Sequence, residues 1–147
     1  MTLLEDLQRD CTALGTRLFT VTAHDFDAML FRRIHSSHPV EYPAQGTKPM
    51  LRDAWFDLCI TRGDRFVANT PEDFAALYPD HAFIRSLGLG AAVNIPVRGD
   101  SGQIAGTVNL LAESCHFTPE RLARYQALID ARRPGLARLL AKGAAGL

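Results

Sequence analysis

The stretch AAVNIPV-RGDSG-QIAGTVNLL (residues 91–111) predicts two β-strands joined by a short turn. Residues 91–97 and 103–111 are rich in aliphatic and β-branched side chains, and residues 98–102 are of types that form turns. Alternate residues of a strand face opposite sides of a sheet. One face of this hairpin therefore carries bulky aliphatic side chains: Val93, Ile95, Val97, Ile104, Val108 and Leu110. The other face carries mainly small side chains and two amides: Ala92, Asn94, Pro96, Ala105, Thr107, Asn109 and Leu111.

The face with the small side chains is a candidate floor for a small-molecule pocket, because small residues leave room and amides supply oriented donors and acceptors. Pairing Val97 with Ile104 keeps the bulky rows together, and it predicts Asn94 opposite Thr107 and Ala92 opposite Asn109. A solvated outer face of an antiparallel sheet would show the same pattern. The amphipathic stretch 50–60 favours a covered face, since Trp55 and Leu58 need a surface to bury against.

The remaining pattern predicts an α+β fold in which helices pack on an antiparallel sheet. Helical spacing of apolar residues, caps and prolines predicts helices over 3–14, 50–60 and 71–77, a short one opening after Asp80, and a last one from 119 that Pro134 interrupts. Strand-forming residues predict further strands over 17–22, 28–35 and 66–68.

Length and charge restrict the function classes. A chain of 147 residues is about one domain, and its 16 basic and 16 acidic residues cancel. It therefore lacks the basic excess from which nucleic-acid and anionic-membrane binding draw affinity. Three cysteines, Cys11, Cys59 and Cys115, form no disulfide framework and predict reduced thiols. The acidic N-terminal segment is unlike a signal peptide, so we expect a cytoplasmic protein with no nucleic-acid or membrane partner.

Residues 80–97 (DHAFIRSLGLGAAVNIPV), 103–110 (QIAGTVNL) and 117–120 (FTPE) together resemble a GAF domain. The resemblance implies a GAF-like (profilin-like) central antiparallel sheet of five to six strands. It also implies terminal helices on one face, often forming a homodimer interface, and a ligand cleft with short helices on the other. On this basis residues 1–142 form a single GAF-like domain, and residues 143–147 form a flexible C-terminal tail.

The motifs of three GAF subtypes are incomplete in this chain. Bilin-binding members carry Cys-His where this chain has Asp80-His81. The signature of cyclic-nucleotide-binding members is absent from the sequence. Free methionine sulfoxide reductases place cysteines in cleft loops, where neither Cys11 nor Cys115 maps. We therefore expect a non-enzymatic sensory or regulatory domain that binds a small organic molecule non-covalently, with no cofactor and no metal. The alternatives are a thiol-dependent redox enzyme related to free methionine sulfoxide reductase, using Cys59 with a second cysteine, and a dimeric interaction module without a ligand.

The candidate ligand-binding residues come from the floor, the middle helix and the loop before it. They are Trp55, Asn94 and Asn109, followed by His81, Tyr42 and Lys48. Trp55 is an aromatic side chain on a helix that faces the small side chains, and Lys48 could meet an anionic group. His81 opens a helix, where backbone N–H groups favour an anion. His35 and His38 have the spacing of metal ligands, but without a clear third ligand we expect them to end a strand instead.

Overall fold

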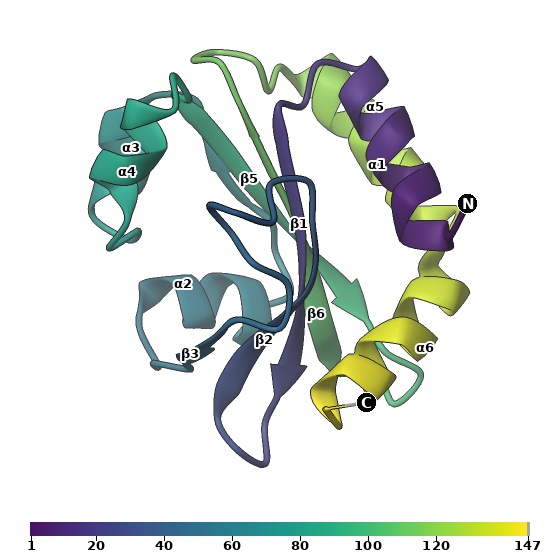
Figure 1. The fold of residues 1–147 in the computed structure, drawn as a ribbon. Coiled ribbons are helices and arrows are strands. Elements are labelled where there is room, and N and C mark those ends of the chain that lie inside the picture. The colour runs from purple at the N-terminus through teal and green to yellow at the C-terminus, as the bar shows by residue number, and fades with distance from the viewer. Residues whose placement is uncertain (147) are drawn as a thin grey trace.

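A six-stranded antiparallel sheet forms the centre of the molecule in a computed structural model that describes residues 1–146 (Figure 1). The spatial order of its strands is β3-β2-β1-β6-β5-β4. In chain order the strands are β1 (Leu18–Asp25), β2 (Leu30–Ser36), β3 (Thr47–Pro49), β4 (Phe66–Ala68), β5 (Ala91–Arg98) and β6 (Ile104–Ala112). The predicted α+β fold with a central sheet of five to six strands is confirmed.

The helices divide between the two faces of the sheet as predicted (Figure 1). One face is covered by α1 (Leu3–Ala13), α5 (Pro119–Asp130) and α6 (Arg133–Ala144). The bulky hairpin row, including Val93, Ile95 and Val108, lies in the core beneath them. The opposite face, called here the cleft face, carries α2 (Ala54–Phe56), the π-helical turn η1 (Asp57–Thr61), α3 (Pro71–Ala75) and α4 (His81–Ser86).

The register of the central hairpin differs from the predicted one by two residues. Asn94 pairs with Asn109, and Ala92 pairs with Leu111. The register shifts between Val97 and Arg98, and such a bulge inserts an unpaired residue next to the turn. Because the offset is an even number, the side chains of 91–97 and 106–111 still face the predicted sides, but the two amides now lie directly opposite each other. The bulge reverses the prediction beside the turn: Ala105 packs against the helix-side core instead of the cleft face, and Ile104 lies near Gly63, outside that core.

The middle helix is shorter than the predicted 50–60. It begins at Ala54, because the carboxylate of Asp53 accepts a hydrogen bond from the backbone N–H of Phe56 at 2.9 Å and caps the helix. The residues before it belong to an irregular segment that follows β3, a strand the pattern did not predict. Met50 is buried there, whereas Leu51 is 66% exposed, so Leu51 does not belong to the buried stripe.

The C-terminal helices break where the proline predicts. Pro134 lies in the first turn of α6, where its missing N–H costs no hydrogen bond. Helix α6 continues to Ala144, and Gly143 is buried against Ile34, so the helix enters the segment 143–147 predicted as a flexible tail. Leu147 of that tail lies outside the described residues.

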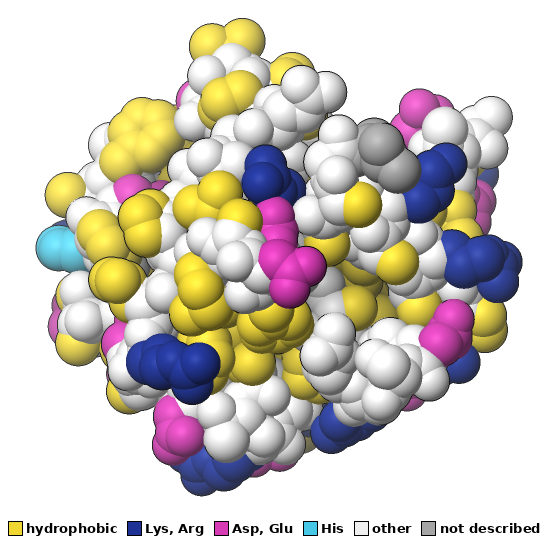
Figure 2. Space-filling model, turned by 90° about the horizontal axis from the view of Figure 1, so that it is seen from below, with side chains coloured by type: hydrophobic (Ala, Val, Ile, Leu, Met, Phe, Trp, Pro, Cys, Tyr) yellow, Lys and Arg dark blue, Asp and Glu magenta, His cyan; other side chains and the backbone are white. Residues whose placement is uncertain are grey.

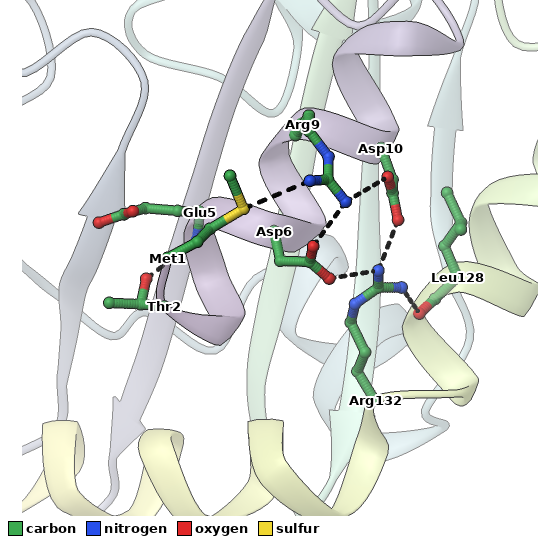
Figure 3. Close-up of polar contacts among 8 residues, drawn as sticks. All are labelled: Met1, Thr2, Glu5, Asp6, Arg9, Asp10, Leu128 and Arg132. Atoms are coloured by element: carbon green, nitrogen blue, oxygen red, sulfur yellow. Dashed lines mark hydrogen bonds and ion pairs between the residues drawn. The ribbon is translucent and has the colours of Figure 1, made fainter.

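An ion cluster joins the N-terminal helix to the junction of α5 and α6 (Figure 3). The Arg132 guanidinium donates to Asp6 at 2.8 Å, to Asp10 at 2.5 Å and to the carbonyl of Leu128 at 2.8 Å. Arg9 donates to Asp6 at 2.6 Å from the solvent side. The hydrogen bond from Arg132 lowers the pKa of Asp6. These contacts fix α1 beside α5.

Among the described residues, no helix is long and apolar enough to cross a bilayer.

Candidate functional site

A cavity of about 270 Å³ lies over the cleft face of the sheet. This volume is close to the lower end of the roughly 300–1,000 Å³ typical of ligand pockets. Its floor comes from β1, β5 and β6, and its walls come from β2, β3, α2 and the segment between α3 and α4. Floor and wall residues that matter below are Thr20, Thr22, Arg33, Tyr42, Lys48, Asp53, Trp55, Tyr78, Asp80, Asn94, Thr107 and Asn109.

The two amides of the floor form a continuous chain of hydrogen bonds. The indole N–H of Trp55 and the hydroxyl of Tyr78 both donate to Asn94 Oδ1, at 2.8 Å and 2.5 Å. Asn94 Nδ2 donates to Asn109 Oδ1 at 2.7 Å. Asn109 Nδ2 then donates to the hydroxyl oxygens of Thr20 and Thr22, at 3.1 Å and 3.0 Å. Because every member is bonded to the next, the floor is held in one arrangement.

Tyr78 contacts this floor through its hydroxyl and packs its ring against a neighbouring helix residue. Its ring stacks on Phe74 with centroids 5.4 Å apart. Burial raises the pKa of its hydroxyl well above the ordinary value, so the hydroxyl keeps its proton and serves as a donor to Asn94. The tyrosine holds one wall of the cavity to the floor.

The connection between β2 and β3 reaches across the cavity through Tyr42. The Tyr42 hydroxyl donates to Asp80 at 2.6 Å, and its ring lies between the Arg33 guanidinium at 5.1 Å and the Phe83 ring at 5.9 Å. Burial and the contact with Asp80 raise the pKa of Tyr42. The loop is therefore attached to the segment before α4 by two residues of the cavity lining.

An aromatic cluster lies beside the cavity at the end of β1. His24 is 3% exposed, and its ring lies 5.2 Å from that of Phe31, 5.9 Å from Phe26 and 6.4 Å from Trp55. Neither ring nitrogen of His24 has a hydrogen-bond partner among residues 1–146. Burial lowers the pKa of His24 to about 4. Lys48 lies over the Phe31 ring at 5.7 Å, on the cavity side.

Five of the six predicted site residues line this cavity: Tyr42, Lys48, Trp55, Asn94 and Asn109. The sixth, His81, opens α4 as expected but lies outside the cavity lining, where its neighbour Asp80 stands instead. Whether these residues bind a ligand stays a prediction.

Sequence reasoning missed several lining residues, above all Thr20, Thr22, Arg33 and Tyr78. The positions of Thr20 and Thr22 could have indicated part of the cavity floor, because two polar residues that are two apart in a strand face the same side of the sheet.

The cysteines lie in three separate places. Cys11 is a buried residue of α1 on the helix-covered face, Cys59 is a buried residue of η1 packed on the cleft face, and Cys115 is exposed after β6. Burial raises the pKa of the Cys11 and Cys59 thiols to about 12. His35 is likewise on the helix side, where it pairs with Gln8 at 2.6 Å.

A second hollow of about 520 Å³ lies between α6 and the turn that joins β5 to β6. Viewed from below, the molecule shows hydrophobic side chains around a hollow in the middle of this face, with basic and acidic side chains near them (Figure 2). The lining is made largely of alanines and of charged side chains such as Arg138 and Lys142. It contains no network comparable to the bonded floor of the first cavity, so we regard the first cavity as the candidate site.

Comparison with known proteins identifies the fold. No family model and no curated protein matches the sequence. Among solved structures, the GAF domain/HD domain protein from Geobacter sulfurreducens is 16% identical, with a TM-score of 0.71 over 95% of this chain and 90% of that chain. The GAF domain of a phosphoenolpyruvate-protein phosphotransferase from Coxiella burnetii is 18% identical, with a TM-score of 0.67 over 98% and 83%. The type II free methionine-R-sulfoxide reductase from Thermoplasma acidophilum is 13% identical, with a TM-score of 0.62 over 97% and 96%.

Proposed function

Because the chain has the GAF-domain fold, we propose that it is a sensory domain that binds a small organic molecule non-covalently over the Asn94–Asn109 pair. The observation that carries the proposal is the cavity of about 270 Å³, whose floor is a continuous chain of hydrogen-bonded polar side chains. A preorganised polar floor between apolar walls is the usual construction of a ligand site. The fold alone does not decide function, since one fold hosts many activities.

A thermal-shift screen against a metabolite library tests this proposal. A ligand present at a hundred times its dissociation constant stabilises the folded state by about 2.7 kcal/mol. Trp55 is the only tryptophan of the chain, so its indole N–H signal in an NMR spectrum locates any hit. We expect at least one hit that moves this signal and that Trp55→Phe weakens. A screen without any such hit overturns the proposal and favours the interaction module.

Thiol-dependent redox catalysis is the second candidate, because one structural neighbour is a free methionine-R-sulfoxide reductase. The geometry favours it less, since the thiolate is the reactive form and burial raises the pKa of Cys59 to about 12. Cys59 also has no second cysteine beside it within the described cleft-face core. Methionine sulfoxide reduction by the wild type that Cys59→Ser abolishes would establish the enzyme.

We further propose a homodimer through the terminal helices. The Arg132 cluster holds α1 beside the start of α6, so these helices present one fixed outer surface. Sedimentation equilibrium of the full chain measures the mass directly. A monomer at all accessible concentrations would contradict the proposal.

A further inference from the structure

The indole of Trp55 fixes the direction of the whole hydrogen-bond chain in the floor. An indole N–H can only donate, so the Asn94 atom that faces it at 2.8 Å must be the carbonyl oxygen. The opposite atom of Asn94 is then its NH₂ group, which donates to Asn109 Oδ1. Asn109 is oriented in turn, and its NH₂ group must donate toward β1. The orientation of both amides follows from a single donor-only group.

The chain ends at two hydroxyls that are left with protons to donate. Thr20 and Thr22 each accept one hydrogen bond from Asn109 Nδ2. Neither hydroxyl donates to another side chain within the part of the protein that the structure describes. A hydroxyl that already accepts a hydrogen bond is a stronger donor, because bonds in a chain polarise one another. Both threonines line the cavity, so this floor calls for an acceptor on the ligand.

A positive charge belongs to the lining of the same cavity. Arg33 is the register partner of Thr22 across β1 and β2, and both residues line the cavity. One guanidinium nitrogen donates to the Pro43 carbonyl at 3.0 Å, and Nε has no partner among residues 1–146. Arg33 forms no direct ion pair with a carboxylate among these residues. Asp80 lies near enough to attract the guanidinium without a direct ion pair, so Arg33 keeps an N–H donor that no acceptor of the described chain takes.

Each of the two carboxylates of the lining accepts a hydrogen bond from the protein. Asp53 Oδ1 accepts from the Phe56 backbone N–H and caps α2, and Asp80 Oδ2 accepts from the Tyr42 hydroxyl. Lys48, a second cation of the lining, makes no ion pair within the described chain and rests over the Phe31 ring. Besides these carboxylates, the lining presents the hydroxyls of Thr20 and Thr22 as donors and Arg33 and Lys48 as cations without an ion pair in the described chain.

We propose that the ligand of this cavity is a small organic carboxylate, whose anionic group is bound by the hydroxyls of Thr20 and Thr22 and by the guanidinium of Arg33. The proposal rests on the proposed function and adds the chemical class of the ligand. The planar guanidinium suits a carboxylate better than a point anion, because it offers parallel donors. The apolar walls formed by Trp55 and Ile84 would contact the carbon part of the ligand.

Three probes with the same ring test the class of ligand: benzoate, benzamide and benzylamine. Each is titrated into the full chain while the Trp55 indole N–H signal is followed. We expect benzoate to bind about tenfold or more tightly than benzamide, because a hydrogen bond to a charged group is stronger than a neutral one, and benzylamine not to bind. Arg33→Gln should weaken benzoate binding about tenfold or more. Lys142→Gln, which removes the same charge from α6, should leave it unchanged.

Preferential binding of benzamide or benzylamine, or no binding by any probe, overturns the carboxylate assignment. The proposed function survives that result if library compounds of another class still move the Trp55 signal, so the two failures are distinguishable. Thr22→Val removes one donor, and Thr22→Ser restores it, so benzoate affinity should fall and recover in that order. If Thr22→Val does not fold, the comparison of Arg33→Gln with Lys142→Gln decides the question alone.

Discussion

Acid should destabilise this protein through His24 before it protonates the carboxylates. His24 is 3% exposed among aromatic rings, and burial lowers its pKa to about 4 from an ordinary value of 6.5. In the unfolded chain the imidazole regains the ordinary value, so the unfolded state binds more protons between these limits. The stability contributed by neutral His24 is therefore complete above about pH 6.5 and is lost progressively as the pH falls toward about 4.

The loss follows from the size of the pKa difference. Each pKa unit corresponds to about 1.4 kcal/mol, so the difference between 6.5 and about 4 corresponds to about 3 kcal/mol. Urea unfolding at several pH values from about 7.5 to about 4 measures the free energy of unfolding over this window. His24→Phe keeps a ring in the cluster and removes the titrating group.

The comparison between wild type and His24→Phe isolates this histidine. Burial also lowers the pKa of His35 and His116, so both proteins should lose some stability in acid. The wild type should lose about 3 kcal/mol more than the variant over the same window. Parallel profiles for the two proteins would refute the reasoning, because they would show that His24 is not held neutral by its surroundings.

Three further substitutions test separate parts of the structure. Asn94→Ala removes the acceptor of both the Trp55 indole and the Tyr78 hydroxyl, and an unsatisfied buried donor costs about 1–3 kcal/mol; we expect a loss of about 3 kcal/mol in urea unfolding, and a loss below about 1 kcal/mol would contradict the bonded floor. Gly106→Ala places a methyl group 2.3 Å from the Thr22 carbonyl oxygen, which belongs to a central strand and cannot easily move; a loss of about 3 kcal/mol is expected, and an unchanged Tm would exclude this close approach. Arg132→Gln should lower the Tm by separating α1 from the α5–α6 junction, by an amount that shrinks at high salt; a salt-independent loss would indicate that packing, not charge, holds these helices.

The faces of the sheet could be predicted from the sequence, but the register of the hairpin could not. The alternation of bulky and small residues in 91–97 and 103–111 depends only on the two-residue repeat of a strand, and it is confirmed. The register also depends on the bulge beside the turn, which inserts a residue without changing which residues are bulky. The predicted register was therefore wrong by two residues. The predicted facing is right for 91–97 and 106–111 and wrong for Ile104 and Ala105 beside the bulge.

Local patterns also could not show which side chains meet across the cavity. Arg33 enters the site because the β1–β2 register shifts between Val21 and Thr22, and no repeat in the sequence marks that shift. The contact between Tyr42 and Asp80 joins residues 38 positions apart in the chain. Such contacts are set by the packing of the whole molecule. The candidates Asn94 and Asn109 belong to one hairpin, so the sequence of that hairpin alone predicts that they share a face.

Trp55 belongs to both the aromatic cluster of His24 and the polar floor of the cavity. Its ring contacts His24 and Phe31, and its N–H bonds to Asn94. Protonation of His24 puts a buried charge beside the Trp55 ring. It therefore disfavours the packing of Trp55 in which the indole N–H donates to Asn94 and orients the floor. A ligand that binds only the oriented floor must then bind less tightly in acid. By reciprocity, the same ligand must hold His24 neutral to a lower pH, because coupling between two binding equilibria acts equally in both directions.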